Sequence, residues 1–279
     1  MAASFGAEVL KLRKRPATWV VGLIFVVTTL LFGYLFSYLF VVNAPESGGL
    51  PQEARDGVLQ FLIPGSVLGN VLSTFASFGS ALALVLGALA MGSEYGWDTF
   101  KVILTQRPGR LGFLAGKLLA AGAALLAITL VILAAGAAAS YVIASTEDAA
   151  VEWPSLWEIV KGVGAGWLIL ATFASMGVLL ATLVRGTALA IGVGLVYLLV
   201  LESLFTALTS QNETVAEIAS RLPAKNSLDL AGAFGQAPPG FGGAPGEAVE
   251  PATAAITLGV YAVVFLTLVV VLFKRRDQS

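Results

Sequence analysis

Residues 162–208 read GVGAGWLILATFASMGVLLATLVRGTALAIGVGLVYLLVLESLFTAL. The stretch contains one basic and one acidic side chain, Arg185 and Glu202, and apolar residues do not alternate with polar ones along it. A helix needs about 20 apolar residues to cross the hydrocarbon core of a bilayer. The stretch is therefore long enough for two membrane helices, and Arg185–Gly186 predicts the tight turn between them.

Similar apolar runs lie on both sides of this stretch. Backbone groups in lipid must be hydrogen-bonded within the protein, and the lack of a two-residue period favours helices over a barrel. The sequence predicts an all-α polytopic membrane protein with six transmembrane helices in one domain, residues 1–279. The expected spans are residues 18–42, 64–91, 118–144, 162–184, 187–208 and 254–273.

Composition agrees with this fold and excludes several classes of protein. Hydrophobic residues make up 57% of the chain and charged residues 12%, about half the usual charged share. A soluble enzyme with one core and a disordered chain are both excluded. Cys and His are absent, which removes disulfides, thiol nucleophiles and His-based triads, and no glycine-rich phosphate-binding motif occurs. We expect no catalytic residue, metal site or bound cofactor in this chain.

The basic residues between the spans predict the orientation. Twelve Lys and Arg residues fall on one side of the membrane and four on the other. Because basic segments stay in the cytoplasm, both termini are expected to be cytoplasmic. The twelve are Lys11, Arg13, Lys14, Arg15, Lys101, Arg107, Arg110, Lys117, Arg185, Lys274, Arg275 and Arg276, and the four are Arg55, Lys161, Arg221 and Lys225.

The first residues of the chain are expected to lie on the membrane. Residues 1–17 predict an amphipathic helix on the inner leaflet, with Phe5, Val9 and Leu12 opposite Lys11 and Lys14. A frayed basic tail is the alternative.

The longest segment on the opposite side is residues 209–253, which we expect to be an extracellular loop. Its Gly- and Pro-rich part, residues 236–251, predicts flexibility. Residues 215–234 can form one or two short helices at the outer surface.

The most informative segment is residues 92–117, which the predicted orientation places in the cytoplasm. Glu94 suits the first turn of a helix, where a carboxylate is favoured by the helix dipole. Large apolar side chains follow at Trp97, Phe100 and Ile103. Such residues at a basic cytoplasmic face indicate either burial in the inner leaflet or a docking surface for a partner, and periodicity favours neither.

The same segment carries a resemblance to a known family. It contains GSEY at 92–95, DT at 98–99, ILT at 103–105, RPGR at 107–110 and KL at 117–118. This series resembles the pattern after the second span of the permeases of type-2 ABC exporters. Residues 8–16 with Trp19, and residues 273–277, are similar to the two ends of these permeases. Asp98 departs from the pattern, which has Gly before the Thr, and this leaves the local turn geometry open.

The resemblance implies a membrane subunit that pairs with a second copy or a paralogue. It also implies two separate ATPase subunits, which would hold the ATP and magnesium, and a coupling role for residues 92–117. The residues expected at the ATPase are Glu94, Tyr95, Trp97, Asp98, Thr99, Phe100, Ile103 and Arg107. Of these, Glu94, Tyr95 and Thr99 match the pattern of the family itself.

Polar side chains within the second span form another candidate site. They fall at spacings that place them on one helical face, which suits either tight helix packing or a surface that lines the substrate path. The face consists of Asn70, Ser73, Thr74, Ser77 and Ser80. Asn70, Thr74 and Ser77, together with Glu202, are the candidates for a translocation path.

Glu202 is the clear acid deep in a span, about 9 Å from its outer end at 1.5 Å per residue. An intramembrane carboxylate is costly and is commonly functional. Glu202 either serves the path or a dimer contact, or is a structural acid that snorkels or is bonded to hydroxyls such as those of Ser203 and Thr206. Gly162 and Gly166 form a GxxxG motif, which predicts helix packing.

The sequence therefore favours the membrane subunit of an ATP-driven exporter in the cell membrane. An ATP-independent secondary transporter is the alternative, but such proteins usually show inverted repeats and several intramembrane charges. An intramembrane enzyme lacks the necessary residues, and a scaffold or channel component is less favoured. Nucleic-acid binding has no support, because the basic clusters flank the spans. The uncharged spans favour an amphipathic or hydrophobic substrate, with membrane lipid as the surrounding partner.

Overall fold

The computed structural model describes residues 2–43, 51–96, 110–208, 213–235 and 248–275. These residues form helices and no strands, and six segments are long and apolar enough to cross a membrane. The six are Pro16–Val42, Pro64–Glu94, Leu111–Thr146, Leu156–Val184, Thr187–Phe205 and Pro251–Arg275. The predicted all-α fold with six membrane spans is confirmed.

Spans one and two are each interrupted by a π-helical turn. Span one consists of α2 (Pro16–Thr28), the π turn η1 (Thr29–Leu35) and α3 (Phe36–Val42). After α4 (Gln52–Leu62), span two consists of the short 3-10 turn η2 (Pro64–Ser66), α5 (Val67–Thr74), the π turn η3 (Phe75–Gly79) and α6 (Ser80–Gly96). A π turn inserts a residue into the helix and rotates the side chains that follow it. A face predicted from a regular period therefore does not continue through such a turn.

Spans three, four and six are uninterrupted helices, namely α8 (Arg110–Thr146), α9 (Leu156–Val184) and α14 (Pro251–Arg275). The 37 residues of α8 extend over about 55 Å, more than the hydrocarbon core requires. α8 begins inside residues 92–117. The end of this segment, which we expected to be a connection between spans, is therefore the first two turns of span three.

The turn after span four is as tight as the sequence predicts. α9 ends at Val184, and Arg185 adopts the left-handed conformation with φ +53°. Such a residue commonly ends a helix, because it turns the chain away from the helix axis. Span five begins at once with α10 (Thr187–Val196) and continues through the π turn η4 (Tyr197–Glu202) into α11 (Ser203–Leu208).

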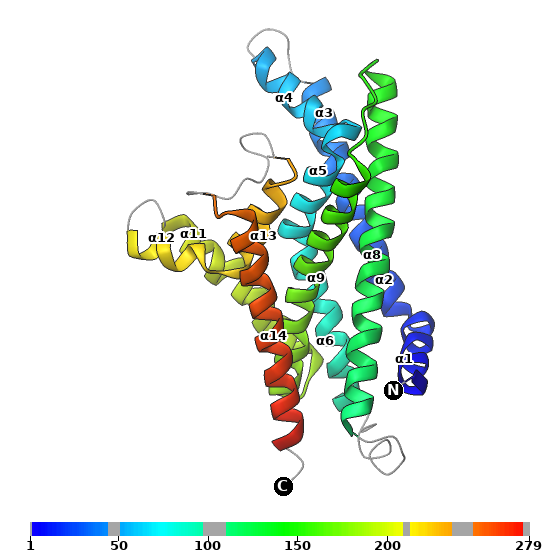
Figure 1. Cartoon of the computed structure of the whole chain (residues 1–279), viewed down its shortest axis with the longest axis vertical. Coiled ribbons are helices and arrows are strands. Elements are labelled where there is room, and N and C mark those ends of the chain that lie inside the picture. The colour runs from blue at the N-terminus through cyan, green and yellow to red at the C-terminus, as the bar shows by residue number, and fades with distance from the viewer. Residues whose placement is uncertain (1, 44–50, 97–109, 209–212, 236–247, 276–279) are drawn as a thin grey trace.

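The core lies around α9, which is at the centre of the bundle (Figure 1). Glycines bring α6 and α9 into backbone contact. A Cβ at Gly87 would stand 1.9 Å from the carbonyl oxygen of Ala174, and a Cβ at Gly177 would stand 2.1 Å from that of Leu84. Small residues allow this approach, which is a common way for membrane helices to pack.

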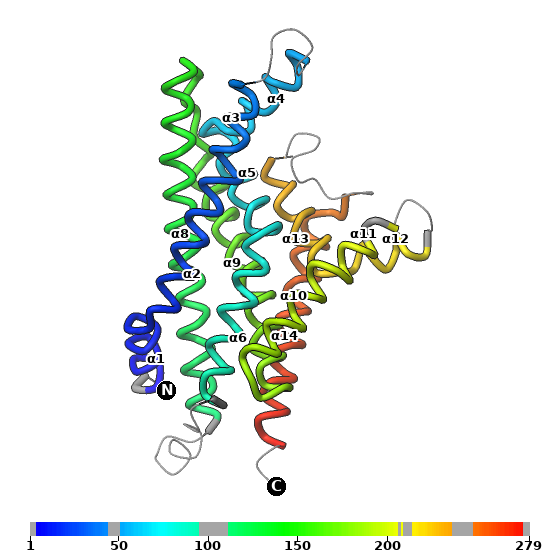
Figure 2. The backbone as a smooth tube through the Cα atoms, turned by 180° about the vertical axis from the view of Figure 1, so that it is seen from behind, coloured from blue at the N-terminus to red at the C-terminus, as the bar shows by residue number. Residues whose placement is uncertain are grey.

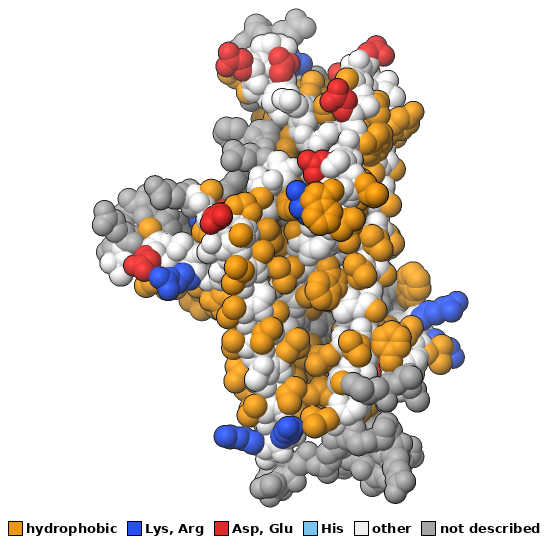
Figure 3. All heavy atoms as spheres, viewed as in Figure 1, with side chains coloured by type: hydrophobic (Ala, Val, Ile, Leu, Met, Phe, Trp, Pro, Cys, Tyr) orange, Lys and Arg blue, Asp and Glu red, His pale blue; other side chains and the backbone are white. Residues whose placement is uncertain are grey.

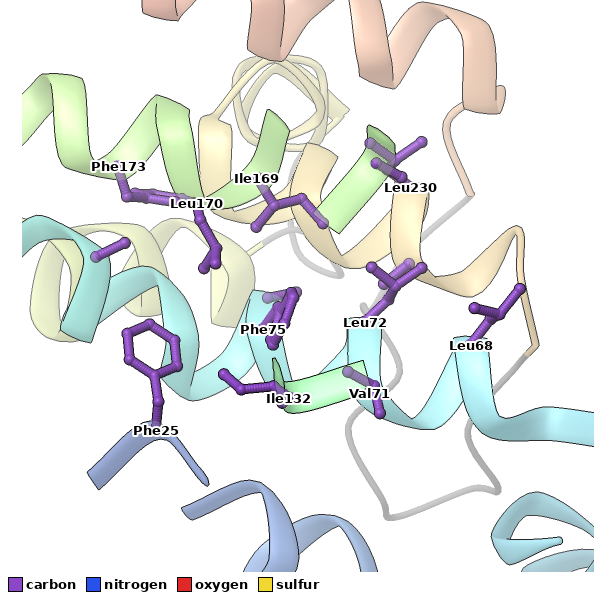
Figure 4. Close-up of a cluster of buried hydrophobic side chains, with 14 of the residues drawn as sticks. Phe25, Leu68, Val71, Leu72, Phe75, Ile132, Ile169, Leu170, Phe173 and Leu230 are labelled. Atoms are coloured by element: carbon purple, nitrogen blue, oxygen red, sulfur yellow. The ribbon is translucent and has the colours of Figure 1, made fainter. Parts of the chain in front are cut away.

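Larger side chains fill the space between spans two, three and four (Figure 4). Phe75 and Ile132 are fully buried there. The predicted GxxxG pair also packs in this region. A Cβ at Gly162 would stand 2.8 Å from the Leu68 side chain, and a Cβ at Gly166 would stand 3.0 Å from the Phe75 ring.

Two short helices follow span five, α12 (Glu213–Ser220) and α13 (Pro223–Gly232). The two short helices that the sequence suggested are therefore present, and their place at the outer surface stays a prediction. Seven of the ten residues of α13 are buried among α5, α9 and α14. Lys225 Nζ donates to both carboxylate oxygens of Asp229 at 2.8 and 2.6 Å, and Asp229 accepts the N–H of Val249. Internal pairing lets a polar helix insert among the spans, because its polar groups keep hydrogen bonds.

Charges of opposite sign gather at opposite ends of the bundle (Figure 3). We call the end that holds α1 (Ala2–Lys14) and the last turn of α14 the basic end, and the other the acidic end. The basic end carries Lys and Arg at both of these helices, including Lys14 and Lys274. This distribution is what the predicted orientation requires, although the orientation itself stays a prediction.

Candidate functional site

The N-terminal helix α1 packs against α8 at the basic end (Figure 2). Gly116 permits the close approach, because a Cβ there would stand 2.8 Å from the Cβ of Ser4. Ser4 and Glu8 are buried in this contact, whereas Val9 is 40% exposed. The predicted helix is present and turns Ser4 and Glu8 toward the protein, while Phe5 and Leu12 of its apolar face are half-buried.

Glu8 of α1, Glu94 of α6 and Lys117 of α8 meet beneath this helix. Lys117 Nζ lies 2.9 Å from Glu8 Oε2 and 3.0 Å from Glu94 Oε1, and it also donates to the carbonyl oxygen of Ala90 at 3.2 Å. The Lys117 side chain is 4% exposed and that of Glu94 is 1% exposed. Three separate elements are therefore joined by one buried ammonium group.

Lys11 completes the group by bonding both acids. Its ammonium lies 3.3 Å from Glu8 Oε1 and also forms an ion pair with Glu94. We call Glu8, Lys11, Glu94 and Lys117 the buried charge cluster, of which Lys11 is the partly exposed member, at 27%. Its two cations balance its two carboxylates, which is the condition under which buried charges are tolerated. Beside it, Arg15 donates to the Ser93 hydroxyl at 2.9 Å, a second link between the N-terminal residues and α6.

The buried charge cluster holds together the two ends of the predicted coupling segment. Glu94 stands near the start of residues 92–117 and Lys117 at their end, so their ion pair brings the two ends together. The sequence led us to expect Glu94 as an exposed acceptor for a partner's Arg or Lys. The structure instead places its carboxylate on cations of its own chain, where a partner does not reach it. Its role in coupling stays a prediction.

Most of the residues predicted to contact the ATPase lie outside the described residues. These are Trp97, Asp98, Thr99, Phe100, Ile103 and Arg107. Tyr95 belongs to the last turn of α6, but its side chain is also outside the described part of the structure. Their docking role stays a prediction.

Asn70, Thr74 and Ser77 are brought together in a pocket of about 70 Å³ between spans one and two. Asn70 Nδ2 donates to the carbonyl oxygen of Gly33 in η1 at 2.9 Å. The π turn η3 then breaks the predicted polar face. Ser77 is exposed, whereas Ser80 is buried and bonded to the carbonyl oxygen of Ala76. Glu202 does not line this pocket, so the four path candidates do not form one site.

Glu202 is 2% exposed and binds the start of α13. Its Oε2 accepts the backbone N–H of Ala224 at 2.7 Å, and the Tyr197 side chain also hydrogen-bonds to it. The N–H groups in the first turn of a helix have no partner within that helix. Glu202 therefore fixes α13 to span five. The hydroxyl bond that the sequence suggested to Ser203 or Thr206 stays a prediction, because the Thr206 side chain lies outside the described part of the structure.

Glu202→Gln should leave the protein folded, because the amide oxygen still accepts the Ala224 N–H. Glu202→Leu should lower the free energy of unfolding by about 1–3 kcal/mol, since it leaves that N–H buried without a partner. Thermal unfolding in detergent measures both. Glu217→Leu, at an exposed carboxylate, is the matched control. Equal stability of Glu202→Leu and wild type would contradict the anchoring role.

We further expect Glu202→Gln to alter transport or substrate-stimulated ATP hydrolysis.

The sequence did not single out Glu8 or Gly33, and Lys117 counted only toward the orientation and the family pattern. The i, i+3 spacing of Glu8 and Lys11, and a lone Lys at the start of an apolar run, were the available signals. Within the described residues, no three acidic side chains gather as a metal site would require.

Comparison with known proteins adds one match. A family model described as "ABC-2 family transporter protein" matches residues 2–278. The match includes all six spans, the buried charge cluster and the pocket at Asn70. A search of curated proteins finds no match.

Proposed function

The chain belongs to the ABC-2 family of transporter proteins and is a permease subunit of an ABC transporter, and from this premise we propose how it works. Two copies, or one copy and a paralogue, form the path for an amphipathic or hydrophobic substrate. Two separate ATPase subunits bind residues 92–117 and supply the ATP and magnesium. The complex exports its substrate across the cell membrane.

The buried charge cluster is the observation that carries this proposal. A force applied by an ATPase to residues 95–116 reaches Glu94 on span two and Lys117 on span three at the same time. Glu8 and Lys11 pass it on to α1 and so to span one. If the two ends of the segment moved independently, the force would not be transmitted to the spans. Because the ion pairs hold the ends together, the segment moves three helices at once.

The pocket at Asn70 supports a path between two subunits. Ser77 and Phe78 are exposed at mid-span although the remainder of span two is largely buried. A hydroxyl within the membrane is stabilised by a hydrogen bond to a polar neighbour. A second copy of the chain or a polar part of the substrate supplies that neighbour. Asn70, Thr74 and Ser77 then line the path at the contact of the two subunits.

The test is to co-express the chain with a candidate ATPase subunit, extract both in mild detergent and reconstitute them in vesicles. We expect co-purification, and transport that requires ATP and both proteins. Transport by this chain alone, driven by an ion gradient, would support the secondary-transporter alternative instead.

The orientation is tested by single Cys substitutions. Because the chain has no Cys of its own, any labelling reports on the introduced residue. An impermeant maleimide added to intact cells should label Ala149→Cys and Gly240→Cys. Gln106→Cys and Gln278→Cys should react only after permeabilisation, because basic segments remain in the cytoplasm. Labelling of Gln106→Cys from outside would reject both the orientation and the position of the coupling segment.

A further inference from the structure

The pocket between spans one and two has a buried end whose chemistry the proposed path does not explain. Asn70 is 1% exposed, and both N–H groups of its amide are occupied. Nδ2 donates to the carbonyl oxygen of Gly33 at 2.9 Å and to that of Phe61 at 3.4 Å. Because rotation of the amide would lose both bonds, Oδ1 is fixed in its position. Oδ1 has no hydrogen-bond partner among the described residues.

A second acceptor stands beside the first. The Thr74 hydroxyl donates its hydrogen to the carbonyl oxygen of Asn70 at 3.1 Å, so that Oγ1 presents only lone pairs. Both oxygens lie against Gly33, where a side chain would clash with them. A Cβ there would stand 2.8 Å from Asn70 Oδ1 and 3.0 Å from Thr74 Oγ1. The buried end of the pocket thus carries two acceptors, while an unpaired buried acceptor is costly.

The open side of the pocket is aromatic. The rings of Phe32 and Phe78 are stacked with centroids 4.8 Å apart, and both side chains are more than 40% exposed. Ring faces attract cations, and no Lys or Arg lines this pocket. A volume of about 70 Å³ holds a small polar group and leaves an attached alkyl chain outside, against the two rings.

We propose that this pocket binds the primary ammonium head of an amphiphilic amine, with its N–H groups on Asn70 Oδ1 and Thr74 Oγ1. The proposal rests on the proposed function, since it makes such an amine the class of substrate. Neutral acceptors and ring faces select a cation that donates hydrogen bonds over a cation that does not.

The test uses two probes that share a charge and an alkyl chain, octylammonium and octyltrimethylammonium. Calorimetric titration of the purified permease in nanodiscs, with empty nanodiscs as the blank, gives Kd for each. We expect octylammonium to bind about tenfold more tightly, because only it has N–H donors.

Thr74→Val separates hydrogen bonding from size, because it keeps the side-chain volume and removes one acceptor. It should reduce the preference for octylammonium to about threefold and leave octyltrimethylammonium binding unchanged. Thr129→Val is the matched control, since Thr129 is also buried and bonded to a carbonyl four residues earlier, but in α8. Gly33→Ala should also weaken octylammonium binding, although Asn70 must shift to admit the methyl group.

Equal Kd values for the two probes in wild type would overturn the proposal. A preference that Thr74→Val leaves intact would do the same, because size alone would then explain it. These measurements need no ATPase. A loss of the preference therefore does not contradict the proposed binding of an ATPase, which co-purification tests. Failure to co-purify likewise does not contradict the proposed amine site.

Discussion

Lys117→Met is expected to lower the free energy of unfolding by about 3–5 kcal/mol, the cost of removing one partner from a buried ion pair. Lys117 bonds Glu8 and Glu94, and the change leaves both carboxylates facing Lys11 alone. For a protein of this size the melting temperature should fall by roughly 10 °C. Thermal unfolding of the purified protein in detergent is the measurement. In complexes with the ATPase, hydrolysis should also become less dependent on substrate.

Lys274→Met is the matched control, because Lys274 is exposed at the same end of the bundle. Glu94→Gln combined with Lys117→Met should cost less than the two single changes added together, since the pair shares one interaction. A Lys117→Met protein that unfolds with wild-type stability would show that the buried charge cluster does not hold α1, α6 and α8 together.

The spans could be predicted from the sequence because each is a local property. An apolar run such as residues 162–184 has few alternatives to a membrane helix, and Arg185–Gly186 marked the turn within the longest run. The buried charge cluster could not be predicted in this way. Glu8, Glu94 and Lys117 lie far apart in the chain, and an intervening loop of any length could bring such charges together.

Two other features escaped prediction for physical reasons. The polar composition of α13 gives no sign of its burial, which is explained by internal contacts such as the pairing of Lys225 with Asp229. The π turn η3 has no composition signal, so the phase of Ser80 relative to Ser77 was wrong although both residues were noted. Asn70 and Thr74 precede that turn, and their predicted shared face is retained in the pocket.

Replacing Trp97 and Phe100 together by Ala should abolish or strongly reduce co-purification with the ATPase subunit. Large aromatic side chains at the centre of an interface commonly contribute 2 kcal/mol or more each, so the pair is worth about a thousandfold in Kd. Neither residue belongs to the buried charge cluster. The melting temperature of the permease alone should therefore stay within about 2 °C of wild type. This contrast separates docking from the stability effect expected for Lys117→Met.

The matched control is Trp153→Ala with Trp157→Ala, which removes two exposed aromatic rings at the acidic end. Co-purification should be unchanged in that variant, because the proposed ATPase site lies at the opposite end. If Trp97→Ala with Phe100→Ala assembles and couples like wild type, the docking assignment is wrong. Burial of these rings in the inner leaflet is then the better explanation, and it predicts weaker membrane anchoring of residues 92–117 instead. Because Glu94 bonds within its own chain, Glu94→Gln should act mainly on stability, and the two aromatic residues carry the test of binding.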